Sequence, residues 1–232
     1  EKVGQMMNQT PAIERLNIPP YDWWNEALHG VARAGRATVF PQAIALAATF
    51  NDEDVYETFN IVSDEARAKY HQYQKDKEYD RYKGLTFWTP NINIFRDPRW
   101  GRGMETYGED PYLTSRMGVA VVKGLQGNDP KYFKTHACAK HYAVHSGPEW
   151  NRHEYNAEVS PRDLWTTYLP AFEALVEEAN VQEVMCAYNR FEGKPCCSSD
   201  KLLIDILRNT WGYDEIILSD CGAIDDFWQK DK

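Results

Sequence analysis

The sequence predicts an α/β fold in which parallel strands alternate with helices. Such units close into a (β/α) TIM-type barrel, the class expected here, or spread into a doubly wound sheet. Three observations predict it. Short apolar, β-branched runs alternate with longer stretches whose apolar residues recur at three-to-four spacing. Polar residues follow several of the short runs, as they do where strands end in barrel and open α/β folds. No Gly-x-Gly-x-x-Gly follows any run, which disfavours a dinucleotide-binding sheet.

The elements can be assigned in order along the chain. Val55, Phe59 and Val62 begin a helical repeat that predicts a helix over 52–79. Ser160 and Pro161 suit the N-cap and first turn of a later helix. The remaining predictions are strand 85–88, helix 110–125 ending near Gly127, strand 135–139, helix 160–179, strand 184–187, helix 199–211 and strand 216–219.

The two ends of the sequence resemble helices cut part-way along. Residues 1–7 predict a helix already under way, and residues 226–232 predict another. A complete barrel typically takes about 250 residues. We therefore expect one domain over 1–232, a barrel that is incomplete at its C-terminus and slightly at its N-terminus, with any C-terminal domain absent from this chain.

Composition narrows the classes of partner. The chain has 232 residues and a net charge of −9, which disfavours nucleic acid and anionic membranes. It contains no run of about 18 apolar residues, so no transmembrane helix is expected. Eight Trp and fourteen Tyr could stack on sugar rings or simply fill the core. A neutral small-molecule substrate fits these features.

Five cysteines stand at positions 138, 186, 196, 197 and 221. No Cys-x-x-Cys is present, so a zinc ribbon or thioredoxin-like site is not expected. An odd count with one adjacent pair does not describe a disulfide framework. Cys138 and Cys186 lie in apolar runs and are predicted to be buried thiols.

Asp220 is the strongest candidate for a working carboxylate. It follows the apolar run 216–219, which reads as a buried parallel strand, and such strand ends are where chemistry collects in these folds. The alternative is a turn or helix-capping aspartate in the Asp-Cys-Gly segment.

Other segments combine polar groups with strand ends. The loop 95–111 packs arginines and acids among glycines, which indicates an ion-pair lattice from which one arginine could reach sugar hydroxyls. Lys140 and His141 leave the strand 135–139, and a ligand contact would explain them. His136, His141 and His145 lie close together in the sequence, which suggests a metal site as an alternative. Strand geometry would place His136 and His141 on opposite faces, and no His-x-His or His-Glu-x-x-His occurs.

Five motifs in a fixed order resemble glycoside hydrolase family 3, and within it the β-xylosidase branch. They are WWNEALHG, FRDPRWGRGMETYGEDP, ACAKHYAVHSGPE, VMCAYNRFEGKP and ILSDCGAI, and they span essentially the whole chain. The resemblance implies that the first domain is a (β/α) barrel or a distorted version of one. It also implies an enzyme that needs no metal or organic cofactor.

The resemblance assigns roles to individual residues. Asp220 would be the nucleophile of a retaining mechanism, and Tyr188 would lie against it. Arg102, Lys140 and His141 would hold hydroxyls of the non-reducing sugar.

Two further residues bear on substrate specificity in this resemblance. Glu26 stands where glucosidases of the family carry Asp, and Trp88 would line the same subsite. The longer Glu26 would crowd a hexose hydroxymethyl group and favour a pentose. Cys221 stands where many glucosidases carry Trp and can be disulfide-bonded in relatives.

The general acid/base has no clear candidate in this sequence. In most of the family it is a Glu in a second domain, so we expect these 232 residues alone to be inactive. One branch, the β-N-acetylglucosaminidases, uses a His in the loop after Lys-His, and His145 lies there. The surrounding Pro-Gly-His-Gly of that branch is missing, which disfavours His145.

The sequence therefore predicts a retaining exo-β-glycosidase domain acting on terminal β-xylosides such as xylo-oligosaccharides. By family resemblance a periplasmic or extracellular location is expected. Four alternatives remain, namely a β-glucosidase, a β-N-acetylglucosaminidase with His145 as acid/base, a non-catalytic sugar-binding fragment, and a metal-dependent amidohydrolase barrel. Histidine spacing disfavours the last of these.

Overall fold

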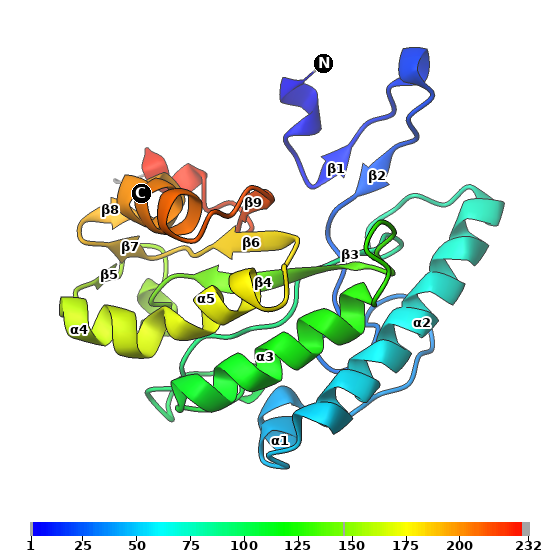
Figure 1. Ribbon diagram of the computed structural model, residues 1–232. Coiled ribbons are helices and arrows are strands. Elements are labelled where there is room, and N and C mark those ends of the chain that lie inside the picture. Colours follow the sequence, from blue (N-terminus) through cyan, green and yellow to red (C-terminus); the bar gives the residue numbers. More distant parts are fainter. Residues whose placement is uncertain (1, 146, 229–232) are drawn as a thin grey trace.

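The structure, a computed structural model, describes residues 2–145 and 147–228. Expectations for residues 1, 146 and 229–232 lie outside that range. One sheet of four parallel strands runs through the molecule in the order β3-β4-β6-β9 (Figure 1). Its strands are β3 (Thr86–Phe87), β4 (His136–Tyr142), β6 (Glu183–Cys186) and β9 (Ile216–Ser219). The predicted α/β class and all four predicted strands are thereby confirmed.

The strand order distinguishes between the two ways of winding a parallel sheet. Each strand lies beside the next strand of the sheet along the chain, so no switch point occurs among these four. A doubly wound sheet reverses its order at such a point, whereas a barrel does not. Asn25 adds a parallel bridge to Phe87 at the β3 edge. The strands of the described residues do not close into a barrel.

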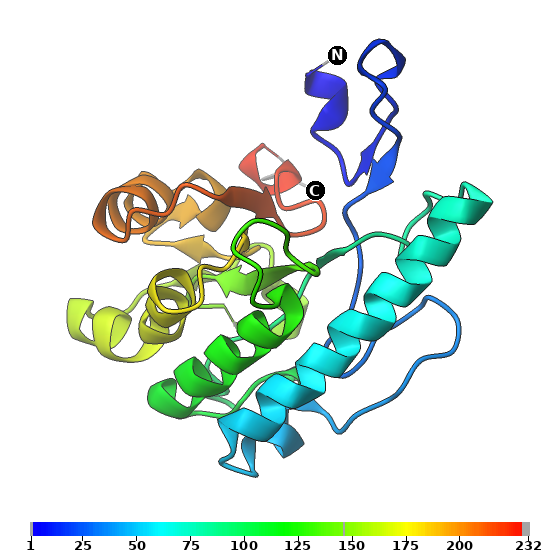
Figure 2. The same ribbon diagram turned by 45° about the vertical axis from the view of Figure 1, so that its right-hand side comes forward.

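Two long helices cover the sheet, close to the ranges predicted over 52–79 and 110–125, although the first of them ends earlier, at Asp76. Helix α2 (Asp52–Asp76) is capped by the Asn51 side chain, which accepts from the Asp54 N–H. Helix α3 (Pro111–Gln126) is capped in the same way by Asp110. The two helices lie side by side, and Val55 and Phe59 of α2 are buried in the core (Figures 1 and 2). A Cβ at Gly124 would meet the Tyr56 carbonyl oxygen at 2.6 Å, so glycine permits this close packing.

The helix predicted over 160–179 is broken. It consists of α4 (Pro161–Asp163), a π turn (Leu164–Tyr168) and α5 (Pro170–Glu177). Pro170 has no N–H to donate to the carbonyl four residues earlier, and its ring would clash with that carbonyl, so the helix cannot pass through regularly. The predicted helix over 199–211 is present as a π-helical stretch, Lys201–Thr210.

Several short elements were not predicted, because two to five residues give no periodic pattern. They are α1 (Ala43–Ala47), the ribbon of β1 (Gln9–Thr10) with β2 (Tyr21–Asp22), and the small sheet of β5 (Asn156–Ala157), β7 (Arg190–Phe191) and β8 (Lys194–Pro195). The ribbon projects away from the main sheet (Figure 2). At the N-terminal end, Val3–Gln5 is a single 3-10 turn, shorter than the helix expected over 1–7. Asp225–Phe227 is also a 3-10 turn, and residues 229–232 of the helix expected over 226–232 lie outside the described residues. Within the described residues, no helix combines the length and apolar composition needed to cross a bilayer.

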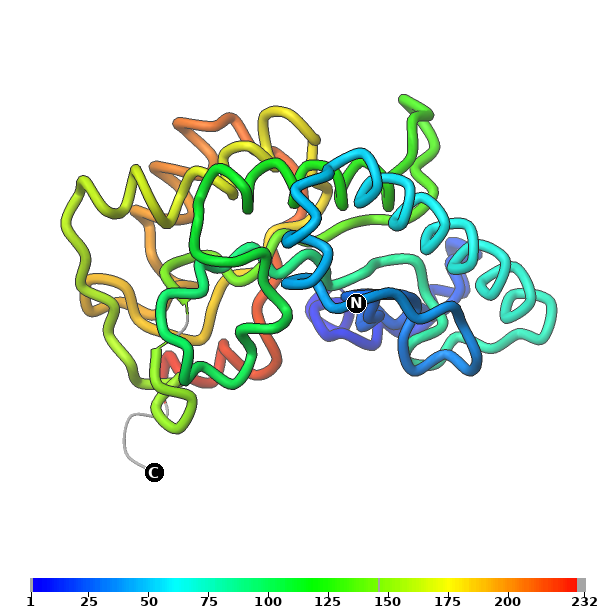
Figure 3. Tube along the Cα trace, turned by 90° about the horizontal axis from the view of Figure 1, so that it is seen from below, coloured from blue at the N-terminus to red at the C-terminus, as the bar shows by residue number. Residues whose placement is uncertain are grey.

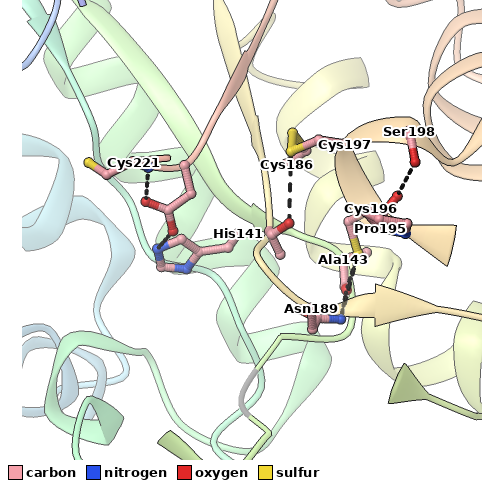
Figure 4. Close-up of a disulfide and its surroundings, with 11 residues drawn as sticks. His141, Ala143, Cys186, Asn189, Pro195, Cys196, Cys197, Ser198 and Cys221 are labelled. Carbon is pink, nitrogen blue, oxygen red and sulfur yellow. Dashed lines mark hydrogen bonds and ion pairs between the residues drawn. A yellow bond between two sulfur atoms is a disulfide. The ribbon is translucent and has the colours of Figure 1, made fainter. Parts of the chain in front are cut away.

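The prediction for Cys186 was wrong, since it forms a disulfide with Cys197 (Figure 4). The end of β6 brings Cys186 beside the 3-10 turn Cys196–Ser198, with a Cα–Cα distance of 5.2 Å that suits a disulfide. The tertiary approach of a strand end and a turn cannot be read from cysteine spacing. Cys138 is a buried free thiol as predicted, and Cys221 is free and exposed.

We expect the double change Cys186→Ser/Cys197→Ser to destabilise this fold. The disulfide closes a loop between residues 11 apart, and constraining such a loop in the unfolded state contributes about 2–3 kcal/mol. Scanning calorimetry should show a Tm lower by roughly 5–10 °C. Cys221→Ser is the matched control, because it removes an unpaired sulfur and should leave the Tm unchanged. An unchanged Tm in the double variant would show that the disulfide adds no stability.

Candidate active site

Asp220 lies directly after β9, at the carboxyl end of that strand. Its N–H donates to the Cys186 carbonyl at 3.2 Å, which continues the pairing of β6 with β9. The residue is only 7% exposed. Oδ1 accepts from the Cys221 N–H at 2.7 Å, whereas Oδ2 has no hydrogen-bond partner among the described residues. The carboxyl group is thus held by one oxygen and offers the other.

A register shift in β4 brings Lys140 and His141 to this carboxyl group together. Lys140 pairs with Met185 and Tyr142 with Cys186, so His141 is the extra residue of a bulge. Bulges re-aim side chains, which lets two consecutive residues serve one site. Both are almost completely buried, and His141 Nε2 lies 3.6 Å from Asp220 Oδ2.

Burial dominates the protonation of this pair. It raises the pKa of Asp220 above its usual value, although the Cys221 N–H and the charges of Lys140 and Arg102 oppose the shift. It lowers the pKa of His141 well below its usual value, and the cations around the ring lower it further. His141 is therefore uncharged at neutral pH, and its contact with Asp220 is not an ion pair.

Arg102 reaches the site already paired. Its Nε and Nη2 donate to the two carboxylate oxygens of Glu105 at 2.9 and 2.8 Å. Arg99 and Asp97 form a second pair in the same loop, so the predicted ion-pair lattice is confirmed for these residues. The charge of Arg102 still opposes the rise that burial causes in the pKa of Asp220. Arg102 is thus held by Glu105 while its charge acts on Asp220.

Glu26 and two tryptophans, Trp24 and Trp88, form a contiguous cluster beside Lys140. The Trp24 indole N–H donates to Glu26 Oε1 at 2.8 Å, and Glu26 Oε2 lies 4.0 Å from Lys140 Nζ. Trp24 stacks on Trp88 with ring centroids 5.2 Å apart and planes inclined by 19°. Lys140 therefore links Glu26 and the aromatic pair to the strand end that carries His141.

Tyr188 lies at the end of the neighbouring strand. Its hydroxyl donates to the Cys221 carbonyl at 2.9 Å, beside the Asp220 carboxyl group, and burial together with that negative charge raises the pKa of Tyr188. The His153 ring packs on it at 4.4 Å. His153 also contacts Asp226 at 3.0 Å, and the loop after β4 lies beside the last described residues (Figure 3).

His145 is close to the site but is poorly suited to proton transfer. Its ring lies 4.6 Å from that of His141 and 5.8 Å from that of Trp100. Burial lowers its pKa to about 3, and the charge of Arg102 contributes. At neutral pH this imidazole carries no extra proton to donate to a leaving group.

Metal ligation receives no structural support in the described part of the chain. No three His, Cys, Asp or Glu side chains are clustered there as metal ligands would be. His136, which the sequence grouped with His141 and His145, contacts Glu183 with Nδ1 3.2 Å from Oε1.

Two residues of the site were missed by sequence reasoning, Asn93 and Trp24 in its role of holding Glu26. Asn93 is buried and makes three hydrogen bonds to His141. The available signal was the two asparagines at positions 91 and 93, which come shortly after a predicted strand.

Comparison with known proteins bears directly on this arrangement. The sequence model of the protein family described as glycosyl hydrolase family 3 N terminal domain matches residues 1–230 of this chain. The chain belongs to glycosyl hydrolase family 3. It is 55% identical over 236 residues to a xylan 1,4-beta-xylosidase of Xylanibacter ruminicola, covering all of this chain and 27% of the relative. It is 44% identical to beta-D-xylosidase 3 of Arabidopsis thaliana, covering 99% of this chain and 31% of the relative.

Solved structures of the family agree with the fold. A GH3 exo-beta-xylosidase (XlnD) in complex with a xylobiose aziridine activity based probe superposes with a TM-score of 0.89 at 36% identity, covering 98% of this chain and 30% of that one. The GH3 beta-glucosidase of Bifidobacterium adolescentis gives a TM-score of 0.79 at 31% identity, covering 93% and 29%. This chain therefore spans under a third of the length of these family members.

Proposed function

We propose that this family 3 chain forms the sugar-binding and nucleophile half of a retaining exo-β-glycosidase site for terminal β-xylosides. The observation that carries the proposal is the buried Asp220 at the end of β9, whose Oδ2 lacks a hydrogen-bond partner among the described residues. In a (β/α) barrel, catalytic groups collect at the ends of strands. We accordingly propose that the β3-β4-β6-β9 sheet is part of such a barrel, and that residues 1–232 form one domain of it.

The proposed chemistry proceeds in two steps. Asp220 Oδ2 attacks the anomeric carbon, the glycosidic C–O bond breaks, and the departing oxygen takes a proton from an acid. Water then attacks the same carbon, the ester bond to Asp220 breaks, and the acid/base takes the proton of the water. Positive charge develops on the sugar during both steps, so an ionised Asp220 stabilises the transition state.

The acid/base is proposed to lie outside these 232 residues. Retaining chemistry needs a second carboxyl group about 5–5.5 Å from the nucleophile. The acids that share cations with Asp220 are already held, Glu105 by Arg102 and Glu26 by Trp24 and Lys140. The neutral, buried His145 also disfavours the β-N-acetylglucosaminidase alternative. We therefore expect residues 1–232 alone to show no turnover.

The cluster of Glu26, Trp24 and Trp88 supports a pentose as the sugar of the substrate. Glu26 is fixed from both sides, so it cannot easily withdraw to admit a hydroxymethyl group. The names of the similar proteins point to xylosides, although β-glucosidases also share the fold. The Cys186–Cys197 disulfide would persist in an oxidising compartment, which supports a periplasmic or extracellular location.

The full-length native enzyme and its Glu26→Asp variant should be assayed on nitrophenyl β-xyloside, β-glucoside and β-N-acetylglucosaminide. We expect the native enzyme to prefer the xyloside. Shortening Glu26 by one methylene should shift the ratio of kcat/KM values towards the glucoside by roughly 10- to 100-fold, the scale of one methylene in a pocket. Glu53→Asp, an exposed acid on α2, is the matched control. Preferred turnover of the acetylglucosaminide would refute the substrate class, and an unchanged ratio would refute the role of Glu26.

A further inference from the structure

The segment between β3 and β4 buries Asn93 against His141. Three hydrogen bonds join the two residues. Asn93 Oδ1 accepts from the His141 backbone N–H at 3.0 Å, and Asn93 Nδ2 donates to the His141 carbonyl at 2.8 Å. The third contact joins Asn93 Oδ1 to His141 Nδ1 at 2.9 Å. Asn93 is 3% exposed, so water does not compete for these groups.

These contacts determine which ring nitrogen of His141 carries the proton. A backbone N–H can only donate and a carbonyl can only accept, so the two backbone contacts fix which end of the Asn93 amide is oxygen. The oxygen end also faces Nδ1, and an amide oxygen cannot donate. Nδ1 must therefore carry the proton, which leaves Nε2 of a neutral imidazole as an acceptor.

His141 Nε2 then faces a second acceptor. It lies 3.6 Å from Asp220 Oδ2, and that oxygen has no hydrogen-bond partner among the described residues. The distance is too long for a hydrogen bond, and neither atom has a proton to give when Asp220 is ionised. Two buried acceptors side by side leave an unmet demand for donors, which a sugar hydroxyl would satisfy.

We propose that Asn93 is a positioning residue that holds His141 in the Nδ1–H form, so that Nε2 accepts a hydrogen bond from a sugar hydroxyl beside the nucleophile. The inference rests on the proposed function and deepens it by fixing the direction of one hydrogen bond to the substrate. A histidine charged at this position would instead donate to Asp220 Oδ2 and occupy the oxygen that must attack.

The surroundings of His141 favour the neutral ring. Lys140, Arg102 and Arg152 place positive charges near it, His145 packs on one face, and Asp220 is the acid opposite. Burial and the cations together lower the pKa of His141, which agrees with the form that Asn93 selects. The arrangement keeps one acceptor available throughout the neutral pH range.

Nitrogen-15 NMR of the full-length native protein labelled at histidine tests the form of the ring without relying on activity. His141 is assigned by comparison with His141→Gln. We expect a protonated Nδ1 and an unprotonated Nε2 between pH 6 and 8, and a change in the Nε2 signal when xylose is added. A protonated Nε2 at pH 7 would overturn the proposal.

Asn93→Asp tests the positioning role through the pH profile. A carboxylate at this position raises the pKa of His141, so the ring gains a proton as the pH falls. Between pH 8 and 5.5, kcat/KM of the variant should then fall at least about tenfold further than kcat/KM of the native enzyme. This factor corresponds to the free energy of one hydrogen bond to a charged group. Asn189→Asp is the matched control, since Asn189 contacts His145 Nδ1 in the same manner at 3.3 Å.

The outcomes separate the two proposals. A steeper pH profile in Asn93→Asp but not in Asn189→Asp supports the inference, and equal profiles would overturn it. If Asn93→Asp does not fold, the NMR result on the native protein still decides. The expected ring form in a protein that hydrolyses none of the three nitrophenyl glycosides would instead refute the proposed function.

Discussion

Replacing Asp220 by Asn is expected to abolish turnover of aryl β-xylosides by the full-length native enzyme. Asn keeps the shape of the side chain and an oxygen that can accept from the Cys221 N–H, so the fold should survive. An amide oxygen is a poor nucleophile and carries no negative charge for the developing cation. Loss of a nucleophile costs about 10⁴-fold or more in kcat.

Steady-state kinetics and a thermal unfolding curve should be measured on the same preparation. Asp214→Asn, an exposed aspartate before β9, serves as the control for a general loss of charge. Turnover near the native rate in Asp220→Asn would remove Asp220 from the nucleophile role. A parallel loss in Asp214→Asn would show that the assay reports folding rather than chemistry.

Replacing Lys140 by Met is expected to produce the second largest loss. Lys140 is buried beside Glu26, and its charge opposes the rise that burial causes in the pKa of Asp220. Removing one preorganised charge or donor from a site that excludes water typically costs about 10²- to 10³-fold. We expect a loss of that size in kcat/KM.

The same variant has a predicted pH signature. The reaction requires ionised Asp220, so kcat/KM rises as the pH rises through the pKa of that group. Without the Lys140 charge this pKa moves up, and the acid limb of the profile should move to higher pH. Lys123→Met, an exposed lysine on α3, is the matched control. An acid limb that stays in place would show that Lys140 does not tune Asp220.

Much of the fold could be predicted because its main elements are long or strongly patterned. The four strands of the sheet and helices α2 and α3 lie close to the ranges that the apolar pattern predicts. The Pro170 break escaped prediction, although proline gives a physical reason for it once the helix is seen. The β1–β2 ribbon escaped because its strands are two residues long.

The site was harder to predict than the fold. Strand-end position identified Asp220, Lys140 and His141 as candidates, and the structure brings them together. The contribution of Asn93 depends on a contact between segments 48 residues apart. The Cys186–Cys197 disulfide depends on the fold of the chain between two cysteines 11 positions apart. The bulge that turns Lys140 and His141 towards one place also lies outside simple period-two reasoning.

The most direct test of the account is to find the residue that becomes covalently attached to the sugar. The full-length native enzyme should be treated with a xylobiose-type aziridine probe, digested, and examined by mass spectrometry. Opening of the aziridine C–N bond by the nucleophile leaves an ester on one carboxyl group. We predict that this ester lies on Asp220 and is absent from Asp220→Asn. An ester on any other residue would contradict the account.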